Sequence, residues 1–169
     1  MEAVALTFKY TQAEYVKADR HYLIASKTIS RTSIVVLAIF LPASILYLFL
    51  SSFSVPGIVF AAIGVVAAIV GSTLYFYTPV YNFKITSKYH EEYTLTFSDS
   101  GISFKTPSID STLKWDVYSE IWESNDFYFL IQSPRMYTLI PKRVFGSPAE
   151  MRMFEDISIS NLKCTKRTV

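Results

Sequence analysis

The sequence is short of cysteine, histidine and glycine. Its single cysteine, Cys164, cannot form an internal disulfide and has no ligand-spaced neighbours that would build a zinc site. The two histidines, His21 and His90, stand apart beside charged residues and do not form a ligand pair. The chain also lacks a glycine-rich phosphate loop and a Gly-x-Ser-x-Gly motif. We therefore expect no metal, no cofactor and no catalytic residue.

Charge is missing from a long internal stretch. Residues 32–83 contain no Asp, Glu, Lys or Arg, in a chain of 169 residues that is 51% hydrophobic and only 18% charged. The formal net charge is +2, and the acids and bases of residues 84–169 balance one another. A protein that binds nucleic acid would gather basic residues on one face. We expect no nucleic-acid partner.

The uncharged stretch is long enough for two membrane spans, since one spanning helix needs roughly 20 apolar residues. We predict spans over 33–53 and 58–78, joined by a turn at "SVPG", where a Pro-Gly pair is a strong turn signal. So short a connection makes the two helices antiparallel. A signal peptide is not expected, because the first apolar run follows residues that already have the pattern of folded structure.

Basic residues near the span ends predict the orientation. Lys27 and Arg31 precede the first span, Lys84 and Lys88 follow the second, and the connecting loop has no basic residue. Loops rich in Lys and Arg stay in the cytoplasm. The pattern predicts a multi-pass protein of the lipid bilayer with both termini cytoplasmic.

Small residues recur on one face of the second span, namely Ala61, Gly64, Ala68 and Gly71. Such residues let helix backbones approach closely in lipid. The face could pack on the first span of the same chain, or it could be a self-association face that makes a homo-oligomer. No ionisable side chain lies in either span, so transport by this chain alone is not expected.

The N-terminal residues predict a strand and then a helix. Residues 4–10 alternate between apolar and polar side chains, as in a half-buried strand. Thr11 and Glu14 have the spacing of a capping box. With no helix breaker before Pro42, we expect this helix to continue into the first span.

The C-terminal part predicts an antiparallel meander followed by a helix, and hence an α+β fold. Ser147, Pro148 and Glu150 mark the N-terminus of that helix. A bent sheet closed by a C-terminal helix is the order of a pleckstrin-homology-like (PH-like) barrel, and the N-terminal strand needs this sheet as its partner. The predicted strands are 92–98, 102–106, 112–117, 127–133 and 136–141, with 119–124 as the start of another.

Two groups of residues are candidates for a site. In "LKWDVYSEIWES", Trp115 and Trp122 are better explained as core than as a ligand cage, because large aromatic rings dominate small cores. Its acids Asp116, Glu120 and Glu123 are most simply a solvated face. Lys142 and Arg143, beside a strand end, are the candidate interaction surface: they could pair with acids or contact lipid phosphates. The basic residues Lys163, Lys166 and Arg167 could lie along the anionic inner leaflet.

The segment from Tyr93 to Phe145 resembles the YcxB-like family of bacterial membrane proteins. The resemblance rests on "YTLTFSDSGISF", "WDVYSEIWES", "NDFYFLIQS" and "MYTLIPKRVF", in that order, and on the upstream strand, helix and membrane hairpin. It implies a bacterial inner-membrane protein with a PH-like cytoplasmic domain, and it implies no catalytic residue. "WDVYSEI" is slightly longer than the usual form of its motif.

These observations predict three parts and one function. The parts are an N-terminal strand and helix (1–32), a transmembrane hairpin (33–80) and a cytoplasmic domain (84–169). We expect a non-enzymatic, membrane-anchored interaction module whose cytoplasmic domain binds a protein, a peptide or the lipid surface. The alternative is an accessory or immunity-type subunit of a membrane complex that acts through its hairpin.

Overall fold

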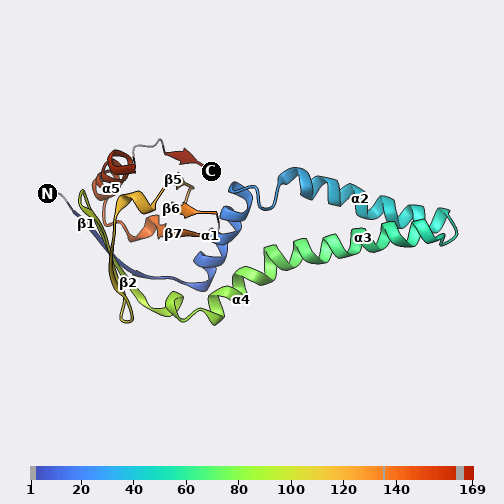
Figure 1. Cartoon of the computed structure of the whole chain (residues 1–169), viewed down its shortest axis with the longest axis horizontal. Coiled ribbons are helices and arrows are strands. Elements are labelled where there is room, and N and C mark those ends of the chain that lie inside the picture. The colour runs from blue at the N-terminus through green and yellow to red at the C-terminus, as the bar shows by residue number, and fades with distance from the viewer. Residues whose placement is uncertain (1–2, 135, 163–165) are drawn as a thin grey trace. The chain divides into compact units, whose positions relative to one another are not determined.

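The computed structural model describes residues 3–134, 136–162 and 166–169, so Cys164 and Lys163 lie outside the described residues. The chain forms two compact units (Figure 1). The first, here called the sheet unit, joins residues 1–18 to 86–169. The second, the hairpin unit, contains residues 19–85. Helix α1 (Gln12–Ala25) contributes residues to both.

The first sheet of the sheet unit, sheet A, contains the N-terminal strand. Strands β1 (Val4–Lys9), β2 (Glu92–Ser98), β3 (Gly101–Lys105) and β4 (Asp110–Leu113) pair in chain order and are all antiparallel. Leu6 lies opposite Leu95, and both are fully buried. The prediction that residues 4–10 join the C-terminal sheet is therefore confirmed.

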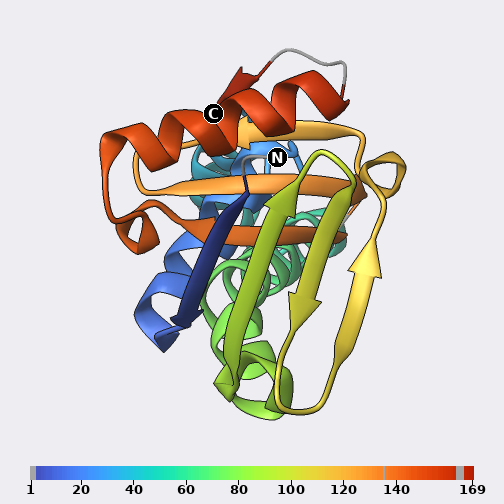
Figure 2. The ribbon, with the colours of Figure 1, turned by 90° about the vertical axis from the view of Figure 1, so that its left-hand side faces the viewer.

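The second sheet, sheet B, is antiparallel apart from one short strand. Strands β5 (Glu120–Glu123), β6 (Phe127–Ser133) and β7 (Met136–Pro141) form a meander, and β8 (Arg167–Thr168) pairs parallel with β5. Figure 2 shows the strands of sheet B running across those of sheet A, with helix α5 (Pro148–Leu162) beside both sheets. The buried core side chains include Leu95, Phe97, Phe129, Leu130, Ile140 and Phe154.

The predicted strand 112–117 is wrong in its second half. Strand β4 ends at Leu113, and Trp115–Val117 form a single 3-10 turn. Trp115 and Val117 therefore do not share a strand face: Trp115 is buried and Val117 is exposed. The turn lets the indole Nε1 of Trp115 donate to the Ser98 carbonyl at 2.8 Å, so the ring enters the core with its N–H group paired.

Both predicted helix N-termini of the sheet unit are confirmed. Glu14 N donates to Thr11 Oγ1 at 3.3 Å, and Thr11 N donates to a Glu14 carboxylate oxygen at 3.1 Å, which is a reciprocal capping box. At α5, Glu150 N donates to Ser147 Oγ at 3.2 Å. Phe154 and Ile157 form the buried stripe of α5.

The prediction that the first helix runs into the first span is wrong. Helix α1 ends at Ala25, Lys27 has a left-handed backbone with φ of 59°, and a new helix, α2 (Arg31–Leu50), begins after Ser30. Ser30 Oγ accepts from Thr32 N at 3.2 Å, so this serine is an N-cap. A side-chain cap and one left-handed residue break the helix without any proline or glycine.

The hairpin unit has two helices long and apolar enough to cross a membrane. Besides α2, residues Val55–Ile85 form one continuous helical stretch. It consists of α3 (Val55–Ser72), a π-helical turn (Thr73–Tyr77) and α4 (Thr78–Ile85). Few residues of either helix are buried within the chain. The π turn presents the Tyr75 carbonyl to Arg20 Nε at 3.1 Å.

The predicted turn at "SVPG" is shifted towards the N-terminus. Residues 51–54 connect the helices, with Ser52 and Phe53 at positive φ, and Ser54 caps α3. Pro56 and Gly57 lie inside the first turn of α3, where proline is tolerated. The remaining short elements are 3-10 turns at Ser87–His90 and Lys142–Val144.

Candidate functional site

Lys142 and Arg143 lie in ion pairs within the sheet unit. Lys142 Nζ is 2.6 Å from Glu123 Oε1 and 4.8 Å from the centre of the Tyr128 ring. The guanidinium of Arg143 binds Glu14 through two nitrogens and donates to the Lys9 carbonyl at 3.0 Å. Of the two options open from the sequence, the structure has the pairing with acids. Arg143 thereby attaches α1 to the end of sheet B.

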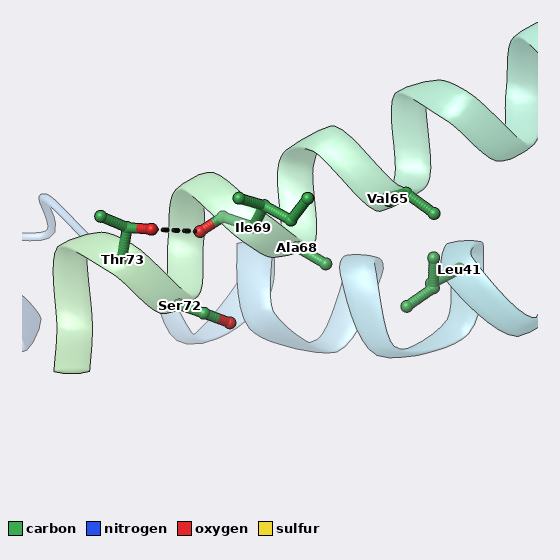
Figure 3. A pocket seen from close by; sticks show the side chains of 6 residues that line it. All are labelled: Leu41, Val65, Ala68, Ile69, Ser72 and Thr73. Carbon is green, nitrogen blue, oxygen red and sulfur yellow. Dashed lines mark hydrogen bonds between the residues drawn. The ribbon is translucent and has the colours of Figure 1, made fainter. Parts of the chain in front are cut away.

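The small-residue face of the second helix is covered at one end only. Ala61 and Gly64 are buried, and a side-chain carbon at Gly64 would lie 3.2 Å from both Leu41 Cδ1 and Ser44 Oγ of α2. Ala68 lines an open hollow of about 380 Å³ between the helices (Figure 3). Gly71 has no neighbour within 4 Å at its missing side chain. The first half of the face therefore packs on α2, and the second half does not.

The edge of β5 binds a further piece of this chain. Trp122 and Glu123 pair with Arg167 and Thr168, and the amide of Val169 donates to the Glu123 carbonyl at 2.8 Å. Strand β6 lies on the other side of β5. Because alternate residues of a strand direct their backbone groups to opposite neighbours, Glu123 offers its backbone to β8 while Trp122 bonds to β6. This edge is therefore able to accept an extended segment.

A cluster of opposite charges lies beside this edge. Lys166 Nζ is 2.8 Å from Glu123 Oε2 and 2.9 Å from Glu155 Oε1, and the hydroxyl of Tyr128 donates to the same Glu155 oxygen. With Lys142, the cluster has two carboxylates and two ammonium groups. The four charged side chains are between 19% and 25% exposed. Pairs so shielded from water interact more strongly than surface pairs do.

These neighbours favour the charged forms of Glu123 and Lys166. Burial alone would raise the pKa of the Glu123 carboxyl, but hydrogen bonds from Lys142 and Lys166 outweigh it, so that pKa is lowered. Burial alone would lower the pKa of the Lys166 ammonium, but the hydrogen bonds to Glu123 and Glu155 outweigh burial, so that pKa is raised. The pKa of the Tyr128 hydroxyl is raised, first by burial and then by its bond to Glu155. Glu123 and Lys166 are thus held in their charged forms beside the edge.

The opposite face of β5 presents Trp122. Its ring is buried, its Nε1 donates to Glu120 Oε2 at 2.5 Å, and the Arg167 guanidinium lies 4.8 Å from the ring centre. A guanidinium over an indole face is a favourable cation–π contact. Trp115 belongs to the core as predicted. Trp122 is also buried, and in addition its ring makes the cation–π contact with Arg167.

The sequence interpretation missed or misplaced three members of this site. Glu155 was not singled out, and Glu123 was grouped with Asp116 and Glu120 as a solvated face; of these three acids, Glu123 is the half-buried one. Lys166 was among the basic residues that could lie along the inner leaflet, and it pairs with two carboxylates. Among the described residues, no group of three or more His, Cys, Asp or Glu could hold a metal ion.

The motifs used for the sequence resemblance fall on consecutive elements of this unit. They cover the β2–β3 hairpin, the turn into β5, then β6 and β7 with the turn at Lys142. Residues 97–157 match the family model described as YcxB-like protein. The predicted resemblance is confirmed over these residues. The YcxB-like segment contains Glu123, Lys142 and Glu155, whereas β1, the hairpin unit and Lys166 lie outside it. No curated protein and no solved structure was found to match the chain.

Proposed function

We propose that this protein is a membrane-anchored, non-enzymatic interaction module that binds an extended peptide segment of a partner at the edge of β5. The observation that carries the proposal is the pairing of Arg167–Thr168 with β5, because an edge that accepts one added strand offers the same backbone groups to another. Main-chain hydrogen bonds would give affinity, and the side chains beside the edge would give specificity.

The hairpin unit supports the membrane anchor. Helices of this length and composition that served as a soluble core would be mostly covered by the rest of the chain, yet few of their residues are buried. A bilayer would cover the large exposed side chains, such as Ile39, Phe49 and Ile69. The basic residues at 27, 31, 84 and 88 favour a cytoplasmic location for both termini, in a bacterial inner membrane as the family resemblance implies.

The element order supports a PH-like sheet unit. Two antiparallel sheets cross one another beside a C-terminal helix (Figure 2), which is the arrangement of a bent, barrel-like sheet with one helix. Domains of this architecture commonly act as binding scaffolds, and fold alone does not specify a ligand. The ligand class therefore has to come from the edge of β5.

The proposal can be tested with a random-peptide library. The full chain lacking residues 166–169, held in lipid nanodiscs, should enrich a family of extended peptides. Those peptides should not bind the same protein carrying Glu123→Pro, which removes the backbone N–H group at the edge. Glu123→Gln keeps that group and removes only the side-chain charge, so it separates loss of strand addition from loss of the carboxylate. A library with no enriched peptide, or peptides that bind the Glu123→Pro variant equally well, would contradict the proposal.

A second function is favoured by one observation in the hairpin unit. The uncovered half of the small-residue face, with Gly71 open and a hollow beside Ala68 and Ser72, has the shape that a neighbouring helix needs (Figure 3). This would suit an accessory or immunity-type subunit that acts through its spans. Photo-crosslinkers placed at Gly71 and at Glu120 would separate the two functions, since a partner captured only from Gly71 favours the second.

A further inference from the structure

We propose that residues 166–169 are an internal ligand of the β5 edge, and that the partner which displaces them is an extended peptide with adjacent Lys and Arg residues. This inference rests on the function proposed above and names the ligand class of the same site. It assigns recognition to Glu123 and Glu155 for the lysine and to Trp122 for the arginine.

The backbone pairing between β8 and β5 is short enough for a partner strand to replace it. Only Arg167 and Thr168 are paired with β5, and both side chains are exposed. The pairing is parallel, whereas every other strand pair is antiparallel among the residues that the structure describes. Parallel ladders have slanted hydrogen bonds that are slightly weaker per residue. A longer strand from a partner would form more of these bonds than the two-residue strand does.

The side-chain contacts give the ligand its charge pattern. Lys166 places one ammonium group between the Glu123 and Glu155 carboxylates, at 2.8 and 2.9 Å. Among the described residues, Lys142 pairs with Glu123 alone, so without Lys166 the described part of the edge has one carboxylate more than it has ammonium groups, and this charge is partly shielded from water. A partner that left this charge unpaired would be disfavoured.

The next residue is recognised on the other face of the strand. Consecutive side chains of a strand point to opposite faces, so a cation that follows the lysine meets Trp122 and not the carboxylates. Arg167 takes this position, 4.8 Å from the ring centre. Arginine suits this position better than lysine because its planar guanidinium stacks on an aromatic face. The two adjacent cations therefore make two different contacts.

Competition with the internal segment provides the test. A tethered segment acts at an effective concentration that is roughly millimolar for a short linker, so a free peptide should bind the intact chain weakly. The probe is a fluorescent peptide of residues 163–169 with Cys164→Ser, and binding is followed by fluorescence anisotropy in nanodiscs. We expect the chain lacking residues 166–169 to bind it at least about ten-fold more tightly than the full chain does.

Three variants make the result specific. Glu155→Gln in the deleted chain should weaken binding about ten-fold, as expected for a lost hydrogen bond between charged groups. The matched control is Asp156→Asn, an exposed neighbour on the same helix, which should leave affinity unchanged. If the deletion disturbs folding, the full chain with Lys166→Gln and Arg167→Gln replaces it and should bind the peptide more tightly than wild type.

Several results would overturn the inference. Equal affinity for the full and the deleted chain would show that residues 166–169 do not compete. Equal binding of a charge-reversed peptide, with Lys166→Glu and Arg167→Glu, would overturn the basic specificity while strand addition still stood. A full chain that is dimeric, and that excess peptide converts to monomer, would mean that a second copy fills the edge. By contrast, if no peptide of the library binds, the proposed function itself is contradicted.

Discussion

At the scale of single residues, Trp115 shows how one side chain can join two elements. Its ring packs near Phe97, and its Nε1 bonds to the Ser98 carbonyl; Phe97 and Ser98 both belong to β2. The turn at Trp115–Val117 is what allows both contacts at once. The large ring therefore stabilises the core, and its N–H group specifies where the chain crosses from sheet A to sheet B.

Trp115→Ala should unfold the sheet unit and not merely remove a contact. Truncating a buried aromatic side chain costs about 3–5 kcal/mol, which is comparable with the whole stability of a small domain. The thermal midpoint in detergent, followed by near-ultraviolet circular dichroism, measures this. Val117→Ala, at an exposed position of the same turn, is the control. An unchanged midpoint for Trp115→Ala would exclude a core role.

The pair of Glu14 and Arg143 should make stability depend on pH. The hydrogen bond from Arg143 is the main cause that lowers the pKa of the Glu14 carboxyl from 4.5 to about 2. A lowered pKa stabilises the fold above the unfolded value, and this contribution is lost as the pH falls from about 4.5 to about 2. At neutral pH, Arg143→Gln should cost about 0.5–1 kcal/mol, because the pair is partly exposed.

The comparison of wild type with Arg143→Gln isolates this pair from other titrating acids. Their unfolding free energies, measured by denaturant titration, should differ at neutral pH and converge towards pH 2. A difference that stayed constant over this range would contradict the assignment.

At the scale of elements, the helical hairpin depends on close approach at its closed end. A side-chain carbon at Gly57 would lie 2.8 Å from Ser51 Oγ and 3.3 Å from the Leu48 Cα, whereas Gly71 has open space. Two glycines of one helix therefore have different roles. Only the first permits the contact between the helices.

Gly57→Val should destabilise the hairpin and Gly71→Val should not. Overpacking at a tight contact costs about 1–3 kcal/mol, and the same substitution in open space costs little. Thermal loss of the helical circular dichroism signal in detergent would rank the two variants. Equal midpoints would show that the helices do not pack as tightly at Gly57 as the structure has them.

At the scale of the whole molecule, the sheet unit is completed from both ends of the sequence. Strand β1 buries Val4, Leu6 and Phe8 against the sheet, although residues 10–91, which include the whole hairpin unit, separate it from β2. Deleting residues 1–10 should expose the edge of β2 and remove the buried side chains of Val4, Leu6 and Phe8, each worth about 1.5–3 kcal/mol, together with that of Tyr10. We expect aggregation on size-exclusion chromatography. The paired substitutions Ala5→Ser and Thr7→Ser, on the exposed face of β1, should leave a monomer.

The orientation of the hairpin is a second prediction at this scale. In a Cys164→Ser background, Phe53→Cys in the connecting loop should react with a membrane-impermeant thiol reagent in intact cells. Asp99→Cys, in the exposed turn between β2 and β3, should react only after permeabilisation, because the proposed topology places the side with the basic residues in the cytoplasm. The reverse pattern of labelling would overturn the proposed topology.

The sequence by itself determined the features that depend on local periodicity and local hydrogen bonds. These include the uncharged helical hairpin, the alternating strands, and the capping at Thr11 and Ser147. Even the pairing of the first strand could be predicted. A lone strand leaves its backbone groups unpaired, and the C-terminal meander was the one predicted sheet that it could join. In each case the signal lies within a few neighbouring residues.

Tertiary structure alone decided the turn at Trp115, the break after Ala25 and the site at the edge of β5. The break depends on the left-handed backbone of Lys27 and the cap at Ser30, and lysine and serine also occur inside unbroken helices. Glu123, Lys142, Glu155 and Lys166 come from four separate segments, and no periodicity relates them. Whether a charge is solvated or paired depends on which segments folding brings within a few ångströms, and that information is not contained in any local stretch of the sequence.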